Sequence, residues 1–213
     1  MQRLYSDAEQ GSDEWLESRI GYVTASKVSD VMAKGTGATK RNYMVKLLCE
    51  TLSGKPTPTF KSDYMQDGND NEPTARLAYE LETGNTVVEQ GFCYMPDIKL
   101  GASTDGTVGE DGLIEIKNVK PAIQVDLIIT GKIKSQYLKQ MQTQMYVLDR
   151  QWCDFVSFSL GDDDGELPEA YKVKIIRVLR DEEMIASILE ATELFHTELS
   201  KLDEQLKELT KEQ

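Results

Sequence analysis

Alternating apolar and polar residues predict a buried strand in the middle of the chain. From Leu113 to Val119, Ile114 and Ile116 fall on one face and Glu115 and Lys117 on the other, because successive side chains of a strand point to opposite faces. Apolar flanks like these are typical of a central strand, where an unpaired charge is costly and usually functional. Further strands are expected at residues 86–94, 100–108, 152–160 and 171–179.

Apolar residues spaced three or four apart predict helices on both sides of this strand-rich region. Capping residues mark several helix ends, such as Thr24 at a start and Gly54 and Gly84 just past a stop. The expected helices span residues 13–19, 24–32, 40–53, 72–82, 133–148 and about 181–211. This mixture predicts an α/β or α+β fold with helices flanking a β-sheet. No internal repeat or linker divides the sequence, so we expect one domain over residues 1–213.

The last helix, at about 181–211, is predicted to be amphipathic. One side carries an apolar seam with three-four spacing: Ile185, Ile188, Thr192, Phe195, Leu199, Leu202, Leu206 and Leu209. Such a seam usually docks a helix on its own domain, and we expect that here. Contact with another subunit or a partner protein is the alternative.

An Asp-Gly step just before the central strand predicts a β-hairpin. With a three-residue loop at Glu110–Gly112, in which Gly112 takes the left-handed conformation, Gly109 pairs with Leu113. A two-residue loop would shift the register by one residue and reverse the faces.

The three-residue loop would bring charged residues together. Asp105 then lies opposite Lys117 and Thr107 lies opposite Glu115, all on one face, whereas the two-residue loop puts Asp105 on the face of Ile116. Two carboxylates and a lysine can make a metal site. The alternative is a surface hairpin whose charged residues form exposed ion pairs.

The chain has 213 residues and a formal net charge of −13, with its charges unevenly distributed. This net charge argues against a protein that coats nucleic acid, because phosphate binding depends on lysine and arginine. Residues 114–150, however, hold six basic residues against three acids, whereas residues 181–213 hold ten acids against three lysines. Acid is therefore concentrated away from the candidate site.

The composition argues against several other kinds of site. Cys49, Cys93 and Cys153 lie far apart without Cys-x-x-Cys spacing, which favours core thiols over disulfides or metal clusters. His196 is the only histidine, so a histidine-based triad or metal site is not expected. With no run of about 18 apolar residues and no export leader, we expect a cytoplasmic protein without membrane contact. Catalysis would have to use carboxylates, lysine and metal.

Six short motifs follow one another along the chain. They are Trp15 with Arg19-Ile20-Gly21, then Thr24-Ala25-Ser26, Gly68-x-x-x-Glu72, Ser103-Thr104-Asp105-Gly106, Glu115-Ile116-Lys117 and Tyr137-Leu138-Lys139-Gln140-Met141-Gln142. Each is weak alone. In this order, over about residues 15–158, they resemble the PD-(D/E)XK nuclease superfamily, and more closely its bacteriophage lambda exonuclease (YqaJ-like viral recombinase) family. The resemblance implies a central mixed β-sheet flanked by helices, and a phage or prophage origin in a bacterial host.

The resemblance also implies an activity and partners. The family's enzymes are magnesium-dependent exonucleases that digest linear double-stranded DNA in the 5′→3′ direction. They release mononucleotides and leave 3′ single strands for recombination by strand annealing. The implied partners are linear duplex DNA, further copies of the chain in a homotrimeric ring, and a single-strand annealing protein. The alternatives are a structure-specific or restriction-type endonuclease and a catalytically idle DNA-end-binding scaffold.

Carried over by position, the family's metal ligands fall on Asp105, Glu115 and the Ile116 carbonyl, with Glu72 assisting at a second Mg²⁺ or Mn²⁺ ion. Magnesium prefers oxygen ligands and retains several waters, so two or three carboxylates suffice. Lys117 would orient the attacking water and either exchange a proton, with a lowered pKa, or only neutralise charge. The residues implied to bind DNA and its 5′-phosphate are Arg19, Ser26, Ser103, Gln140 and Tyr137.

Each of these residues also has a structural interpretation. Glu72 would favour a helix start, although Pro73 after it is expected to keep its backbone extended. Ser26 and Ser103 would be capping or turn hydroxyls, and Arg19 would join a surface ion pair.

The helix at residues 133–148 raises a similar choice. Tyr137 would pack in the core as well as face the DNA. Gln140 and Gln142 cannot share one helical face, and we expect Gln140 to reach the DNA.

Overall fold

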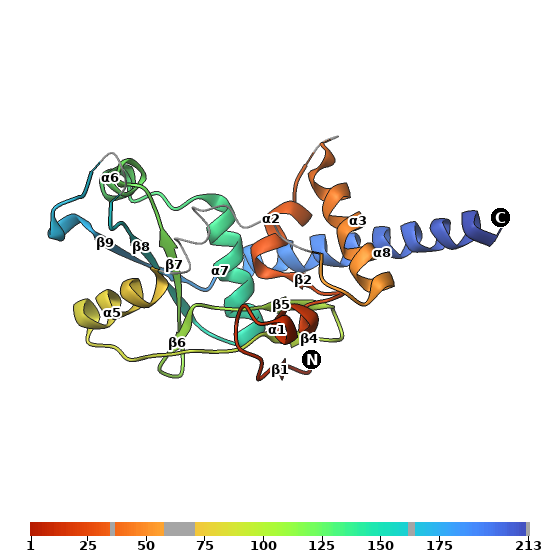
Figure 1. The fold of residues 1–213 in the computed structure, drawn as a ribbon, viewed down its shortest axis with the longest axis horizontal. Helices are drawn as coiled ribbons and strands as arrows, with labels where there is room; N and C mark the ends of the chain where they lie inside the picture. Colours follow the sequence, from red (N-terminus) through yellow and green to blue (C-terminus); the bar gives the residue numbers. More distant parts are fainter. Residues whose placement is uncertain (35–36, 58–70, 162–164, 212–213) are drawn as a thin grey trace.

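The computed structural model describes residues 1–34, 37–57, 71–161 and 165–211, and its strands form two mixed sheets (Figure 1). The four-stranded sheet has the order β1 (Leu4–Tyr5), β4 (Cys93–Met95), β5 (Leu100–Ala102) and β2 (Val23–Thr24). The five-stranded sheet has the order β3 (Val87–Val88), β6 (Gly106–Val108), β7 (Gly112–Asn118), β8 (Trp152–Phe158) and β9 (Val173–Leu179). The predicted α/β fold is confirmed, but its strands are divided between two sheets.

Two of the predicted strands are each interrupted, and each supplies both sheets. The segment predicted at 86–94 forms β3 and β4, and the segment predicted at 100–108 forms β5 and β6. The second break falls at residues 103–105, where the chain passes from one sheet to the other. Thr104 holds this crossing, since its hydroxyl donates to the carbonyl of Ile114 at 2.9 Å. Local alternation cannot show such a break, because both halves keep an extended backbone.

The described helices surround the two sheets. They are α1 (Asp13–Ser18), η1 (Ala25–Lys27), α2 (Val28–Val31), α3 (Ala38–Ser53), α5 (Glu72–Thr83), α6 (Pro121–Thr130), α7 (Ser135–Leu148), η2 (Glu169–Tyr171) and α8 (Glu182–Lys211). As predicted, α3 and α5 end at glycines in the left-handed conformation, Gly54 and Gly84. The helix α6 was not predicted. It buries Gln124 and leaves Ile129 78% exposed, so its sequence lacks the usual amphipathic pattern.

Helices cover both faces of the five-stranded sheet around β7. Ile114 and Ile116 pack with Tyr79 of α5 in one hydrophobic cluster, and Leu113 packs with Met141 of α7 in the other. The predicted alternation of β7 is therefore confirmed, and Glu115 and Lys117 lie on the α7 side.

The hairpin between β6 and β7 differs by two residues from the predicted register. Val108 pairs with Gly112, so the loop is Gly109–Asp111 instead of residues 110–112. Gly109 takes the left-handed conformation, with φ 57°. Gly112 lies in the strand beneath Trp152, where an added Cβ would meet ring atoms at 2.2 Å. The packing of this ring fixes which glycine turns the chain.

This shift corrects the predicted partners but not the predicted faces. Thr107 pairs with Leu113, and the same register places Asp105 opposite Glu115 instead of Lys117. Because the shift is an even number of residues, Asp105 and Glu115 still share a face. Asp105 and Glu115 therefore lie on one face as predicted, although the predicted loop residues were wrong.

The long helix α8 docks on its own domain with the first part of its seam. Ile188 and Phe195 are buried, and Phe195 stacks on Tyr43 of α3 with ring centroids 5.5 Å apart. The last turns project beyond the body of the molecule, and Leu209 is 65% exposed (Figure 1). The predicted docking is therefore confirmed for the first half of the helix.

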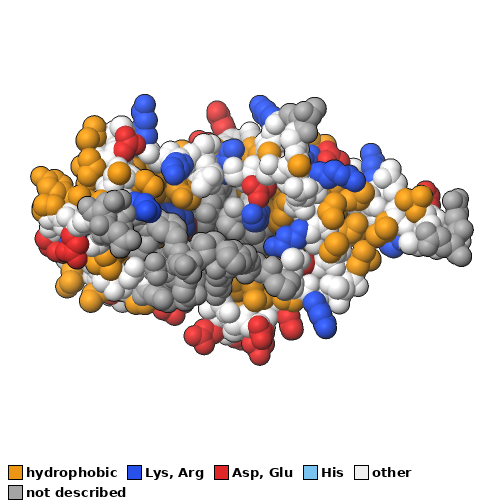
Figure 2. Space-filling view, turned by 45° about the horizontal axis from the view of Figure 1, so that its top comes forward, with side chains coloured by type: hydrophobic (Ala, Val, Ile, Leu, Met, Phe, Trp, Pro, Cys, Tyr) orange, Lys and Arg blue, Asp and Glu red, His pale blue; other side chains and the backbone are white. Residues whose placement is uncertain are grey.

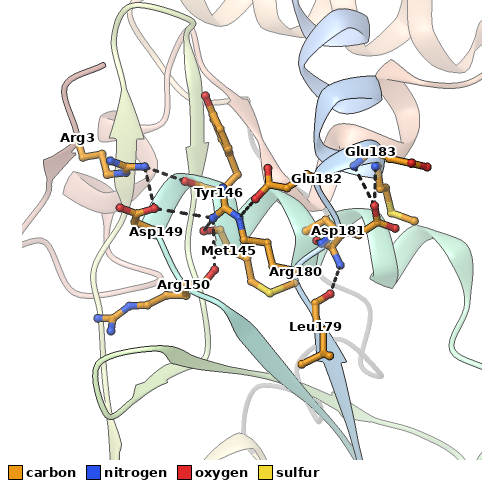
Figure 3. A network of polar contacts seen from close by, with 12 residues as sticks. Arg3, Met145, Tyr146, Asp149, Arg150, Leu179, Arg180, Asp181, Glu182 and Glu183 are labelled. Carbon is orange, nitrogen blue, oxygen red and sulfur yellow. Dashed lines mark hydrogen bonds and ion pairs between the residues drawn. The ribbon is translucent and has the colours of Figure 1, made fainter.

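A polar network joins the end of α7 to the start of α8 (Figure 3). Arg180 lies at its centre, donating to the carbonyl of Met145 at 2.9 Å and pairing with Glu182 at 2.5 Å. Gln142 of α7 donates to the carbonyl of Leu179 at 2.8 Å and accepts from the N–H of Asp181 at 2.8 Å. These contacts join the carboxyl end of α7 to the segment that leads into α8, on the side of α7 away from the cavity.

Two further expectations concern the cysteines and the membrane. Cys93 and Cys153 are buried as predicted, but Cys49 is exposed on α3, so the expectation of three core thiols is wrong for that residue. None of the helices in the described ranges has the length and hydropathy needed to cross a bilayer.

Candidate active site

A cavity of about 700 Å³ opens between β7, α7 and the amino-terminal helices. Its walls contain every residue to which the family resemblance assigned a role: Arg19, Ser26, Glu72, Ser103, Asp105, Glu115, Ile116, Lys117, Tyr137 and Gln140. These residues come from segments far apart in the sequence, and the fold brings them into one concave surface. Gly68 of the Gly-x-x-x-Glu motif lies outside the described residues.

Glu115 is the most enclosed acid of the cavity, with 1% of its surface exposed. Its Oε1 pairs with the ammonium of Lys117 and accepts a hydrogen bond from Gln140 Nε2 at 2.6 Å. Its Oε2 accepts from Gln144 Nε2 at 2.6 Å. A buried carboxylate is tolerated only when it is paired in this way. As predicted, Gln140 faces the site and Gln142 faces away from it.

Asp105 lies beside Glu115 at the crossing between the sheets. Its Oδ2 accepts a hydrogen bond from the backbone N–H of Ile116 at 2.6 Å. Burial raises the pKa of Asp105 well above its usual value, and the charge of Glu115 raises it further, while Lys117 opposes both effects. Two desolvated acids here share one ammonium group, and a cation bound between them would favour the charged form of both.

The pKa of the Lys117 ammonium group is set by burial and by the neighbouring acids. Burial lowers the pKa of Lys117, but the charges of Glu115 and Asp105 outweigh burial and raise it above its usual value. The ammonium also lies 5.5 Å from the ring centroid of Tyr137, which faces the cavity and packs on Phe155. In the absence of metal and phosphate, Lys117 is therefore a charged partner of the two acids, and proton exchange beside a bound metal stays a prediction.

Glu72 begins α5 and reaches the same cavity. Its Oε1 pairs with Arg76 one turn later, at 2.9 Å, and Arg76 also pairs with Glu89. Burial raises the pKa of Glu72, and Arg76 opposes that effect. The expectation that Pro73 keeps Glu72 extended is wrong, because Glu72 is helical and Pro73 occupies the first turn, where no N–H is needed.

Arg19 and Ser103 form a second part of the cavity, joined by Trp15. The guanidinium carbon of Arg19 lies 3.9 Å from the ring centroid of Trp15, a cation–π contact. Trp15 Nε1 donates to Ser103 Oγ at 3.1 Å. Ser26 Oγ lies 3.5 Å from Thr24 Oγ1. Burial lowers the pKa of Arg19, which remains a cation.

Two residues of this arrangement had no predicted role. Trp15 belongs to the first motif, and its contacts with Arg19 and Ser103 depend on a distant crossing of the chain. Gln144 lies outside the motif at residues 137–142, and only the spacing of one helical turn from Gln140 could have indicated it.

The donor set of the cavity suits a hard cation that keeps part of its water. Among the described residues, no three acidic, histidine or cysteine side chains converge tightly enough to form a complete metal-binding group. The cavity instead offers carboxylates from Asp105, Glu115 and Glu72, together with the Ile116 backbone. Magnesium binds through few protein oxygens and several waters, so these residues fit it better than a metal that needs a closed cage.

A sequence model of the YqaJ-like viral recombinase domain matches residues 14–151. The chain belongs to this family. The predicted resemblance is thereby confirmed, and the matched residues of this YqaJ-like chain include most of the cavity.

Known structures agree with this assignment. The chain is 42% identical to an alkaline exonuclease from Laribacter hongkongensis, over 94% of this chain and 99% of that one, with a TM-score of 0.85. That exonuclease has also been crystallised with dAMP. A phage-related exonuclease from Haemophilus somnus 129PT, 17% identical over 87% of this chain and 96% of its own, shares the fold with a TM-score of 0.63.

One viral relative is much longer than this chain. An uncharacterized protein of Acanthamoeba polyphaga mimivirus is 25% identical over 171 residues, which cover 74% of this YqaJ-like chain and 30% of that protein. Together, the family and the exonuclease relative support a nuclease that acts on DNA.

Proposed function

We propose that this YqaJ-like chain is a metal-dependent exonuclease that digests linear double-stranded DNA in the 5′→3′ direction. It would release mononucleotides and leave 3′ single strands for recombination by annealing. One observation carries the proposal: the acids Asp105 and Glu115 and the ammonium of Lys117 line the same cavity as Arg19 and Ser103. The alkaline exonuclease from Laribacter hongkongensis, crystallised with dAMP, supports a mononucleotide product.

The acidic part of the cavity would hold Mg²⁺ or Mn²⁺. Asp105, Glu115 and the Ile116 carbonyl would hold one ion, and Glu72 would assist at a second. Bound there, such ions supply Lewis-acid stabilisation of the attacking and leaving oxygens. Lys117 would keep its positive charge beside the scissile phosphate and offset the negative charge that develops there.

The other part of the cavity would fix the 5′-phosphate. The planar fork of Arg19 suits two parallel hydrogen bonds to phosphate oxygens, and Trp15 holds that fork in place. Hydroxyls of Ser26 and Ser103 and the amide of Gln140 would complete the pocket. A terminal phosphate held there would set the scissile bond at a fixed distance, which would make the enzyme act from an end.

The charge distribution is compatible with DNA binding. On the face shown in Figure 2, lysine and arginine side chains lie across the centre and upper part with some acids among them, and further acids lie at the left end and along the lower edge. We propose that three copies form a ring around the DNA in the cytoplasm of a bacterial host. In a ring, basic residues would line the channel while acids cover the outside. A single-strand annealing protein would be its partner.

The deciding experiment is digestion of end-labelled linear duplex in the presence of magnesium. Early release of a 5′ label as a mononucleotide, with late release of a 3′ label, is the expected result. Closed circular DNA serves as the control, because an exonuclease leaves it intact and an endonuclease cuts it. Binding of ends without release of either label would indicate a scaffold and contradict the proposal.

A further inference from the structure

We infer that Gln144 is a positioning residue of the active site, which holds the Glu115 carboxylate and the Ser103 backbone together through one amide group. The inference rests on the proposed function. It concerns a residue outside the six motifs, on the turn of α7 that follows Gln140.

The contacts of Gln144 define the arrangement. The side chain is fully buried, and its Nε2 donates to Glu115 Oε2 at 2.6 Å and to the Ser103 carbonyl at 2.9 Å. An amide nitrogen carries two hydrogens, so both are used. The bond to the carboxylate is charge-assisted and belongs to the stronger class of hydrogen bonds.

The other end of the same amide shows that this orientation is enforced. Gln144 Oε1 is buried and has no hydrogen-bond partner within the described part of the chain. Leaving a buried acceptor unpaired is costly. Turning the amide over would place Oε1 against two acceptors, the Glu115 carboxylate and the Ser103 carbonyl, and would lose both bonds. Donation to these two groups therefore decides the orientation.

The position of Gln144 differs from that of the other partners of Glu115. Lys117 and Gln140 reach Oε1 and line the cavity, whereas Gln144 holds Oε2 and is not part of the cavity wall. A cation entering the cavity would compete with Lys117 and Gln140 for Oε1. The cation would not compete with Gln144, which bonds Oε2. Gln144 would therefore keep the Glu115 carboxylate in one orientation while the partners of Oε1 change.

The second acceptor connects the two parts of the site. Ser103 also accepts from Trp15, on which Arg19 stacks. The phosphate side and the acidic side of the cavity are thus joined through one buried amide. Loss of that amide should weaken the catalytic step more than DNA binding.

The test compares Gln144→Met with a matched control, Gln142→Met. Both glutamines are buried on α7, and each makes two hydrogen bonds, but those of Gln142 go to Leu179 and Asp181, away from the cavity. Methionine fills a similar volume and donates nothing. Urea unfolding should show a similar loss of stability in both variants.

The two variants should separate in metal binding and kinetics. Calorimetric titration of the DNA-free protein with Mn²⁺ should show binding about 10-fold or more weaker for Gln144→Met, the usual effect of removing a partner that orients a metal ligand. Its kcat should fall by a similar factor with little change in KM. Gln142→Met should keep wild-type values for both quantities.

Equal Mn²⁺ affinity and kcat in the two variants would overturn the inference, because Gln144 would then be merely structural. If Gln144→Met does not fold, Gln144→Asn replaces it, since its shorter amide cannot reach both acceptors. Wild-type Mn²⁺ binding in that variant would overturn the inference as well. A wild-type protein without metal-dependent digestion would instead contradict the proposed function, so the two failures are distinguishable.

Discussion

The carboxylate of Asp105 accepts a hydrogen bond from the backbone N–H of Ile116 at 2.6 Å. This contact ties the crossing between the two sheets to the central strand β7. It places Asp105 beside Glu115, although the chain reaches Asp105 from the four-stranded sheet and Glu115 lies within the five-stranded one. The acidic half of the cavity is thus built where the sheets meet.

Lys117→Ala should abolish digestion and leave the fold intact. The ammonium is the cationic partner of Glu115 in the cavity, and a group that moves protons or offsets developing charge there contributes about 10²-fold or more to the rate. Digestion of linear duplex checks the activity, and circular dichroism checks the fold. Lys201→Ala, on the exposed side of α8, is the control. Full activity of Lys117→Ala would remove Lys117 from the catalytic group.

Arg19→Ala should erase most of the preference for 5′-phosphorylated over 5′-hydroxyl ends. The guanidinium stacks on Trp15 at the side of the cavity proposed to bind the phosphate. Arg19→Lys should restore only part of the preference, because an ammonium lacks the planar fork. The ratio of digestion rates on the two substrates measures the effect. An unchanged ratio in Arg19→Ala would place the phosphate elsewhere.

Glu72→Gln should raise the Mg²⁺ concentration needed for half-maximal digestion. Glu72 lines the cavity but pairs with Arg76, whereas Glu115 is held by Lys117, Gln140 and Gln144, so loss of the Glu72 charge should weaken one ion site and leave Glu115 in place. A Mg²⁺ titration of the digestion rate measures the change. Glu80→Gln, later in the same helix and outside the cavity, should match the wild type. A chelator should stop digestion in all these proteins.

Tyr79→Phe should reveal a pH-dependent contribution to stability. The Tyr79 hydroxyl donates to buried Asp154 at 2.8 Å, and burial together with Asp154 raises the pKa of Tyr79 to about 12. An unfolded tyrosine ionises at about pH 10. The stabilisation is therefore complete below pH 10 and is lost as the pH rises towards 12.

Urea unfolding at two pH values checks this. At pH 9 the wild type should exceed Tyr79→Phe by about 1.5–3 kcal/mol, the range for a hydrogen bond to a charged group. At pH 11 the difference should be smaller. Other groups that titrate in this window are common to both proteins and cancel. A constant difference would contradict the raised pKa of Tyr79.

Phe195→Ala should destabilise the protein far more than Leu194→Ala. Phe195 is fully buried against Tyr43, and removing such a ring costs about 3–5 kcal/mol. Leu194, its neighbour on α8, is 54% exposed and should cost little. The midpoint of urea unfolding compares the two. Similar losses would mean that α8 does not dock through this seam.

Local patterns predicted the parts of the site that depend on one element. Alternation along β7 was enough to place Glu115 and Lys117 on one face. Helical spacing was enough to predict that Gln140 and Gln142 lie on different sides of α7. Both conclusions follow from the fixed periods of strands and helices, which need no knowledge of the partner surfaces.

Patterns failed where a distant contact decides the outcome. The hairpin register depends on Trp152, which packs over Gly112 and leaves Gly109 to turn the chain. The helix α6 was missed because it buries Gln124, which bonds the backbone around Tyr171, and exposes apolar residues.

The sequence by itself determined the glycine stops of α3 and α5, the faces of the central strand and the order of the motifs, from which the family and the candidate residues followed. Only the tertiary structure decided that the strands divide between two sheets, that all ten candidates line one cavity, and that the Gln144 amide bonds both Ser103 and Glu115. The reason is physical. Propensity and periodicity act between near neighbours, whereas a buried charge is stabilised by whichever residues the fold brings within a few ångströms of it.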